Sequence, residues 1–560
     1  MNVLTRSLVV ALFAAASLAA EEPRPTSSDM PLRVGVFGEY ELSLKQAVEM
    51  ALENNLDLEL TRLDQDTSFY NLTAAKGAFD PRLGFGASAQ RQVSAVSSSL
   101  GGGSEPGKLL TKNLAVGPQL GGLLPWTGGS LEAQFTSSRI STDNTFATLN
   151  PQIPTNLRFD FTQPLWRGLR IDDNRRRIAI AKRNQTLSDE AFRMQAIETV
   201  TLAVQAYWNL YFAARNVTIQ REALELARHQ VDSNTRMFEQ GVLAAIDVVE
   251  AETQAATFEQ SFYTAQQNLT VAENQLKTIL LPDFEHPDWG RAWTPITRPD
   301  TEAPLIIVSD AVHTALEHRP ELDRLRLSDE INEVDKRYYR DQTKPQIDFN
   351  ASYAAAGLAG TALTQQSNPF TGGFADIFLR LNELSAAQGL PPIEIPNFGG
   401  GSTTPPFLLG SFSQSFSNLY NRRFPTAAVG LSFSFPIRNR TAEANLGSAM
   451  VQAKRIQAQK AQLEQQIAAQ VRNALQRVQS SQLRLQSAQR ETGLAERQHE
   501  SEQRKLQAGA STVFLALQRQ TQLASARNRE AQAEAELNTA LADLYRATAT
   551  TLEEYSVELR

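Results

Sequence analysis

Four short segments of the chain alternate apolar residues with small or polar ones, which is the two-residue period of a strand with one apolar face. They lie at 82–89, 157–162, 346–353 and 429–435. The segment 113–141 alternates in places as well, and its pattern fits either an extra hairpin or an extension of these strands. The sequence therefore predicts four principal strands and leaves this fifth segment open.

Long helices are predicted for most of the remaining chain. Apolar residues between 248 and 279 recur at steps of three and four, the spacing of a coiled-coil seam. The segment 172–239 contains neither proline nor glycine, so a single helix of nearly 70 residues fits it, with a length on the order of 100 Å. A short helix is expected around 374–387, inside the long loop at 357–423.

An internal repeat relates the two halves of the chain. The stretch "AVEMALENNLDL" at 47–58 lines up with "AVHTALEHRPEL" at 311–322, and the helix turn at Gly241 lines up with a weaker version at Gly509. In the first half, Gly241 lies 77 residues after Pro164, the proline at the end of a predicted strand. In the second half, Gly509 lies 73 residues after the corresponding Pro436. The difference of four residues predicts a stutter in one long coiled coil. Each half therefore carries one copy of the same helix-turn-helix tip.

The two faces of each strand are typical of a membrane barrel, whose outward face meets lipid and whose inward face meets water. Four strands cannot close a barrel, whereas three copies of the chain would supply twelve. The expected fold is mainly α with a β-barrel portion. In it, long antiparallel coiled-coil helices build a hollow tunnel and three copies share a twelve-stranded barrel.

Composition and charge narrow the functional classes. The chain has 54 basic and 61 acidic residues and a net charge of -7, which offers no nucleic-acid footprint. Because there is no cysteine, disulfides, thiolate metal sites and cysteine nucleophiles are excluded. The five histidines lack metal-ligand partners at useful spacing, and no Ser, His and Asp set stands in a recognisable frame. We therefore expect no enzyme activity, no cofactor and no metal site.

The first twenty residues have the features of a secretory signal peptide. Arg6 precedes an apolar run from Leu8 to Ala16, and small residues suit cleavage near Ala19 or Ala20. Beyond this segment no run of 18 apolar residues occurs, so no transmembrane helix is expected. The mature chain is therefore expected to be exported.

Three motifs carry a family resemblance: "TQPLWRG" at 162–168, "FPIRNR" at 435–440 and "GVLAAIDV" at 241–248. With the export signal and the two halves, the chain resembles the TolC outer-membrane efflux protein family over essentially all of its mature length. The resemblance implies a homotrimeric channel in the outer membrane of a Gram-negative bacterium, with a tunnel that extends into the periplasm. It further implies efflux or type I secretion with a periplasmic adaptor protein and an inner-membrane RND or ABC transporter.

The same resemblance implies a role for the two tips in adaptor docking and gating, through Gly241, Val242, Leu243, Gly509, Ala510 and Ser511. It also places Asp247 at the periplasmic entrance, where three copies would bring carboxylates together. Asp247 and Glu250 also have the spacing of a helix N-cap and its third residue, and the two roles are compatible. The second tip lacks the arginine and tyrosine that hold the entrance of many family members closed. Ser511 or Thr512 is expected to cap the last long helix there.

The expected organisation follows the two halves. It comprises a signal peptide at 1–20, first-half short helices at 42–81, strands and loops at 82–165, long helices at 168–281 with a tip at 241–246, a linker at 282–307, second-half short helices at 308–344, strands and a long loop at 345–437, long helices at 440–549 with a tip at 509–512, and a tail at 550–560. A secreted or periplasmic elongated coiled-coil protein with a binding or structural role is the alternative. It would explain the helices but not the four amphipathic strands.

Overall fold

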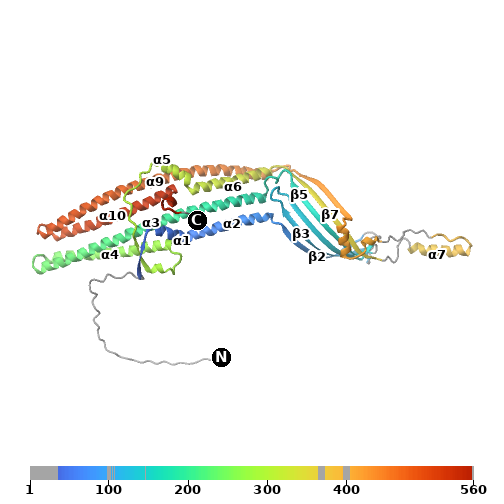
Figure 1. Cartoon of the computed structure of the whole chain (residues 1–560), viewed down its shortest axis with the longest axis horizontal. Coiled ribbons are helices and arrows are strands. Elements are labelled where there is room, and N and C mark those ends of the chain that lie inside the picture. Colours follow the sequence, from blue (N-terminus) through green and yellow to red (C-terminus); the bar gives the residue numbers. More distant parts are fainter. Residues whose placement is uncertain are drawn as a thin grey trace, which may run out of the picture.

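A computed structural model describes residues 36–96, 103, 105, 107–144, 147–363, 372–394 and 404–557. The expected signal peptide at 1–20 and the last three residues of the tail lie outside the described residues. The described chain is elongated, with helix tips at one end and a sheet toward the other (Figure 1).

The first half runs from a short strand through two helices to four strands and two long helices. Its elements are β1 (Gly38–Leu42), α1 (Leu44–Asn54), α2 (Leu56–Lys76), β2 (Arg82–Ala95), β3 (Lys108–Leu123), β4 (Ser130–Thr142), β5 (Leu149–Pro164), α3 (Asp173–Glu239) and α4 (Ala245–Leu280). The second half repeats this order with fewer strands. Its elements are β6 (Arg291–Pro295), α5 (Val308–His318), α6 (Pro320–Gln342), β7 (Gln346–Ala362), α7 (Gly372–Ala387), α8 (Phe412–Tyr420), β8 (Phe424–Ser434), α9 (Arg440–Gln507), α10 (Val513–Thr548) and α11 (Thr551–Glu554).

Helix lengths confirm the internal duplication. α1 and α5 have 11 residues each, α3 and α9 have 67 and 68, and α4 and α10 have 36 each. The stutter predicted from the sequence is therefore wrong, because the long helices match. The difference lies before them instead: α3 begins nine residues after Pro164 and α9 begins four residues after Pro436, and the one extra residue of α9 reduces this difference of five to four.

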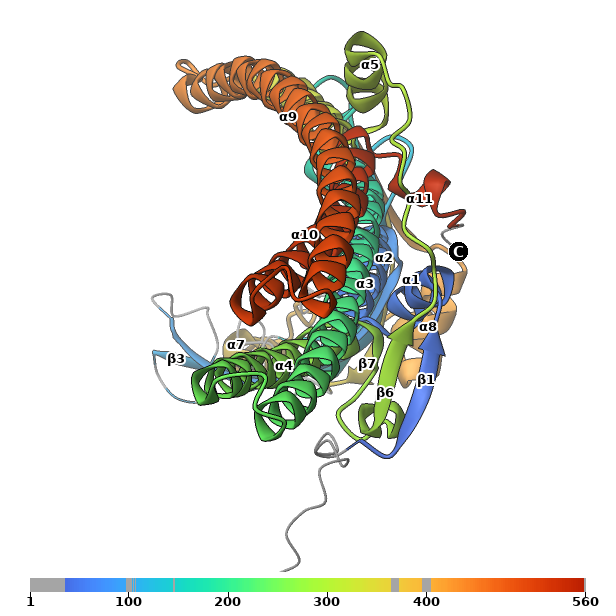
Figure 2. The same ribbon diagram turned by 90° about the vertical axis from the view of Figure 1, so that its left-hand side faces the viewer.

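The long helices form a curved wall. Near the tips α3 packs against α4 and α10, and α10 packs against α9; nearer the sheet α3 packs against α2 and α6, and α6 against α9. Seen from the tips, these helices lie side by side in an arc (Figure 2). The predicted seam is buried, with Phe258, Phe262 and Ala265 in α4 and Leu537 and Ala540 in α10. Many seam positions are alanine, so the helices can pack closely.

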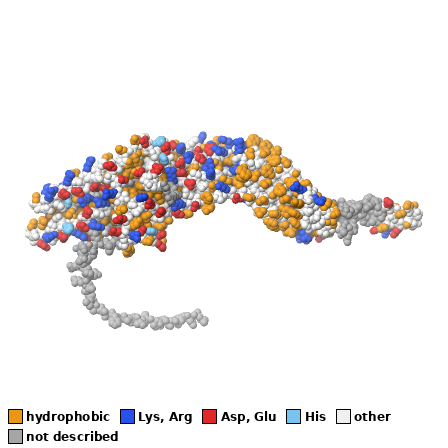
Figure 3. Space-filling view, in the orientation of Figure 1, with side chains coloured by type: hydrophobic (Ala, Val, Ile, Leu, Met, Phe, Trp, Pro, Cys, Tyr) orange, Lys and Arg blue, Asp and Glu red, His pale blue; other side chains and the backbone are white. Residues whose placement is uncertain are grey.

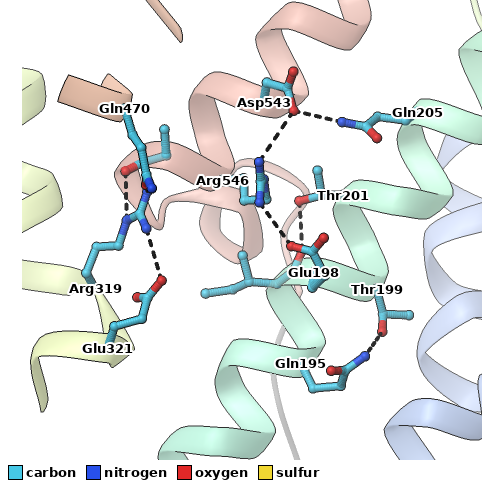
Figure 4. Close-up of polar contacts among 12 residues, drawn as sticks. Gln195, Glu198, Thr199, Thr201, Gln205, Arg319, Glu321, Gln470, Asp543 and Arg546 are labelled. Atoms are coloured by element: carbon cyan, nitrogen blue, oxygen red, sulfur yellow. Dashed lines mark hydrogen bonds and ion pairs between the residues drawn. The ribbon is translucent and has the colours of Figure 1, made fainter. Parts of the chain in front are cut away.

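Polar contacts tie the long helices to their neighbours at mid-length, both between the halves and within the second half (Figure 4). Arg546, near the end of α10, lies 3.3 Å from the Glu198 carboxylate of α3, and Gln205 of α3 donates a 2.8 Å hydrogen bond to Asp543. At the start of α6, Arg319 donates to Glu321 at 3.0 Å and to Gln470 of α9 at 2.9 Å. These contacts fix both full-length helices to the shorter ones beside them.

A parallel pair formed by β1 and β6 flanks the helices at the same level. Lys277 of α4 lies beneath it, 2.6 Å from the Glu273 carboxylate and donating to the carbonyl oxygens of Trp289 at 2.9 Å and Arg291 at 2.6 Å. Both members of this ion pair are almost fully buried. A buried charge pair with these partners holds β6 against α4.

The main sheet is antiparallel, with strand order β2-β3-β4-β5-β7-β8. The four strands predicted from the sequence are β2, β5, β7 and β8. The segment 113–141 forms the separate hairpin β3–β4, which settles the alternative that the sequence left open. The sheet therefore contains six strands, two more than the four predicted.

A short helix covers part of one face of this sheet. The Ser415 hydroxyl of α8 lies 2.9 Å from the Thr155 hydroxyl of β5, and Asn418 donates to the Leu358 carbonyl oxygen of β7 at 2.9 Å. The short helix predicted around 374–387 is confirmed as α7. Among the described helices, none combines the length and the apolar character needed to cross a membrane.

Candidate functional site

The first tip joins α3 to α4 through a tight glycine turn. Gly241 has φ +75, a left-handed conformation that favours glycine, and the Val242 amide donates to the Met237 carbonyl oxygen at 2.9 Å. The Asp247 carboxylate accepts a 3.1 Å hydrogen bond from the Ala244 amide. Asp247 therefore stabilises the start of α4 from its third residue, and the prediction that it is the N-cap is wrong because α4 begins at Ala245.

The second tip repeats this geometry. Gly509 has φ +72 and the Ala510 amide donates to the Lys505 carbonyl oxygen at 2.8 Å. Of the two predicted capping residues, Thr512 is the N-cap, and its hydroxyl accepts from the Leu515 amide at 3.4 Å. The Ser511 hydroxyl instead donates to the Glu502 carboxylate.

One carboxylate and one histidine near the second tip have shifted pKa values. The hydrogen bond from Ser511, reinforced by the Lys505 ammonium, holds the pKa of Glu502 below its usual value. Burial lowers the pKa of His499, and the charge of Arg527 lowers it further. At neutral pH the second tip therefore contains an ionised carboxylate and a neutral buried imidazole.

The two tips pack against each other. Ala251 of α4 and Val513 and Leu517 of α10 form a small buried cluster, with Leu243 and Leu506 beside it. Asn234 of α3 lies under the first turn and donates to the Asp247 carbonyl oxygen at 3.2 Å. The two tips thus share one small buried cluster and together form one structural unit.

Apolar side chains remain exposed around this unit. Val242 is 69% exposed, Ile246 61% and Phe514 59%. A groove of about 670 Å³ runs between α4 and α10 and is lined in part by Val249 and Phe514. Exposed apolar residues beside a groove between helices are typical of a surface that binds another protein.

At the other end of the molecule, the sheet separates apolar from polar side chains. One face carries Leu83 of β2, Leu120 of β3, Ala133 of β4 and Phe159 of β5 in adjacent positions of one row. The opposite face is polar and holds the 2.7 Å ion pair between Arg158 and Asp160 in β5. Figure 3 shows hydrophobic side chains gathered over the sheet and charged ones spread over the helices.

Sequence reasoning missed the contacts that join the sheet to the helices. Arg175, in the first turn of α3, donates to the carbonyl oxygens of Trp126 at 3.1 Å, Leu169 at 3.0 Å and Gly168 at 2.5 Å. Its guanidinium also lies 2.7 Å from the Asp172 carboxylate, which caps α3. The pair Asp172–Arg175 at the helix start was the available signal, but its distant partner at Trp126 was not readable from spacing.

Across the described ranges, no group of three or more His, Asp or Glu side chains could hold a metal ion. The features described above are an apolar rim at the tips and a two-faced sheet at the far end.

Comparisons with known proteins agree with this geometry. A sequence profile described as "Outer membrane efflux protein" matches residues 47–280 and 408–550. The fold is similar to the outer-membrane channel OprN, with a TM-score of 0.58 at 17% identity, over 90% of this chain and 89% of that chain. It is similar to the Campylobacter jejuni CmeC outer membrane channel, with a TM-score of 0.59 at 14% identity over 92% and 90% of the chains. It is also similar to the Vibrio cholerae outer membrane protein VceC, with a TM-score of 0.57 at 15% identity, over 90% of this chain and 95% of that chain. No curated protein sequence matches the chain.

Proposed function

Because the chain belongs to the outer membrane efflux protein family, we propose that three copies assemble into an outer-membrane channel that conducts its substrates passively. Members of this family are efflux channels of tripartite transport systems. The observation that carries the proposal is the two-faced sheet, whose apolar face suits lipid and whose polar face suits water. The curved wall of helices would continue the water-filled space toward the periplasm.

The open edges of the sheet support a closed ring of copies. β2 and β8 each pair with one neighbour within the described residues. β2 runs away from the helices and β8 returns toward them, so β8 of one copy has the direction needed to pair antiparallel with β2 of the next. Unpaired backbone groups are not tolerated in lipid, so closure is required in a membrane. The arc in Figure 2 supports a ring of few copies, which we propose to be three.

The exposed rim of the tips supports docking of a periplasmic adaptor, which would link the channel to an inner-membrane RND or ABC transporter. Because the chain has no cysteine, single cysteines allow clean crosslinking in cells. Val242→Cys is expected to crosslink to a periplasmic coiled-coil protein. Val451→Cys, an equally exposed valine in α9 near the sheet, is the control and should not. Equal crosslinking at both positions would contradict docking at the tips.

Asp247 is proposed to contribute to a carboxylate ring at the entrance. Asp247→Asn removes the charge but keeps an oxygen that can accept from the Ala244 amide, so the turn should survive. We expect block of conductance by divalent cations to weaken in this variant. Glu252→Gln removes an exposed charge from the same helix and should leave the block unchanged. Unchanged block in Asp247→Asn would exclude the ring and leave the capping role.

The proposed function itself is tested with purified protein. We expect extraction to require detergent, native mass spectrometry to give three copies, and planar bilayers to show discrete conductance steps. A monomer that is stable without detergent and shows no conductance would refute the channel. It would support the alternative, a secreted or periplasmic coiled-coil binding protein.

A further inference from the structure

The β3–β4 hairpin is a full part of the sheet. β3 pairs with β2 from Arg82↔Gly121 to Ala95↔Lys108, and β4 pairs with β5 from Ser130↔Thr162 to Ile140↔Gln152. Both strands are as long as their neighbours, at 16 and 13 residues. The hairpin therefore lies within the sheet itself. A plug or a surface loop would not pair with a strand on each side.

The hairpin also continues both faces of the sheet. Leu114, Val116 and Leu120 of β3 are exposed on the apolar face, and Asn113 and Gln119 lie on the opposite one. Within the described strands, the basic side chains on the apolar face lie only at the end far from the helices, at Arg91, Lys108, Lys112 and Arg139. Charges on a lipid-facing wall are tolerated near an interface and costly at mid-depth. These basic residues thus lie where the apolar face would meet a membrane interface, and the middle of that face carries none of them.

The helical part of the chain is adapted to the hairpin. Its turn at 124–129 lies against the end of β5 and the start of α3: Gln163 of β5 donates to the Thr127 carbonyl oxygen at 3.2 Å, and Arg175 of α3 donates to the Trp126 carbonyl oxygen at 3.1 Å. Gly128 in the same turn lies beside Gly168 and Asp172 of the linker between β5 and α3. This linker is the one that is longer than its counterpart before α9. The extra strands and the extra linker residues occur in the same half and contact each other.

We propose that the closed barrel has eighteen strands, where four strands per copy would give twelve, and that its exit passes correspondingly bulkier hydrophilic solutes. The proposal rests on the trimeric channel proposed above. With strands about 4.8 Å apart and tilted by about 40°, eighteen strands give a backbone diameter of roughly 36 Å and twelve give roughly 24 Å. Six strands span roughly 37 Å per copy, close to the roughly 32–40 Å of the four helices beneath them. The barrel therefore continues the helical wall without narrowing.

Deletion of residues 108–142 tests the proposal. Removing two strands leaves β2 and β5 antiparallel, with Leu83 and Phe159 still on the same face. In planar bilayers, polyethylene glycols of graded size are added from the barrel side, so that entry into the barrel is measured separately from the tip constriction. We expect the wild type to admit polymers that the deletion variant excludes. The same size limit in both channels would overturn the eighteen-stranded barrel.

A second measurement does not depend on the folding of the deletion variant. Single cysteines at Gln119 and Gln134 are expected to react with a water-soluble maleimide in the intact membrane, because both face the lumen. The control Val116→Cys faces lipid and should stay unlabelled. Labelling of Val116 with protection of Gln119 would overturn the proposal, as would a wild-type size limit fitting a pore of twelve strands. Absence of any conductance in the wild type would instead refute the channel itself.

Discussion

Replacement of Lys277 by methionine is expected to loosen β1 and β6 from the long helices. The Lys277 ammonium lies 2.6 Å from the Glu273 carboxylate, donates to the carbonyl oxygens of Trp289 and Arg291, and lies 5.5 Å from the centre of the Trp293 ring. Methionine keeps much of the side-chain volume, so the charge and its hydrogen bonds are what the substitution removes. Glu273 then stays buried without its ammonium partner.

The size of the effect follows from burial, because the side chains of Lys277 and Glu273 are only 1% and 2% exposed. Removing one member of a buried ion pair costs about 3 to 5 kcal/mol, since the other charge remains out of water. Amide hydrogen exchange reports the opening of one region without requiring the whole molecule to unfold in two states. The amides of β1 and β6 are expected to exchange roughly a hundred- to several-thousand-fold faster in Lys277→Met.

An exposed pair of the same type is the control. Lys460 lies 3.8 Å from Glu464, also one helical turn away, but the two side chains are 62% and 43% exposed. Lys460→Met is expected to change exchange little, because exposed pairs contribute at most about 1 kcal/mol. Combining Lys277→Met with Glu273→Leu should recover most of the protection. If Lys277→Met exchanged like Lys460→Met, the reasoning from burial would be refuted.

Three further predictions concern other parts of the molecule. Gly241→Ala should destabilise the first tip by about 1 kcal/mol, because the φ of Gly241 is +75. Gly447→Ala, inside α9, should instead stabilise that helix by up to about 1 kcal/mol. Thermal unfolding of the two variants checks both expectations. Burial lowers the pKa of His499 in the folded protein below its usual value of about 6.5. Folding stability should therefore be fully present above about pH 6.5 and should fall as the pH drops toward the folded-state pKa. His499→Gln should flatten this pH dependence, as measured by amide hydrogen exchange. Val116→Arg should impair barrel assembly at a cost of about 2 to 4 kcal/mol, whereas Gln119→Arg on the opposite face should assemble normally, as judged by native mass spectrometry.

The long helices and the tips could be predicted because their signals are local. Nearly seventy residues without proline or glycine predict α3, and a glycine between two apolar seams predicts each turn, since a left-handed residue is a common way to end a helix and glycine adopts that conformation most easily. The N-cap at Ala244 was missed because this residue carries no local signal. Alanine offers no side-chain acceptor, so the sequence pointed to Asp247, three residues further on.

The number of strands could not be read with the same ease. The alternation of β3 is interrupted by Gly121 and Gly122, and on β4 it gives way to Ser137 and Arg139 on the apolar face. Pairing with neighbours on both sides, which no local pattern records, decides that this segment is a hairpin. The role of Arg175 in connecting the sheet to α3 can be recognised only in the folded structure, where the turn at Trp126 lies beside it.

In the proposed channel, the uninterrupted length of α3 would make it a mechanical lever with its fulcrum at the sheet. At 1.5 Å per residue its 67 residues extend about 100 Å, so a tilt of about 5° at the Arg175 end would sweep the opposite end through about 9 Å. A displacement of that size requires no unwinding and no broken backbone hydrogen bond along the shaft. In the proposed channel, small adjustments beside the sheet would therefore be amplified into larger ones at the tips, where the proposed adaptor would dock.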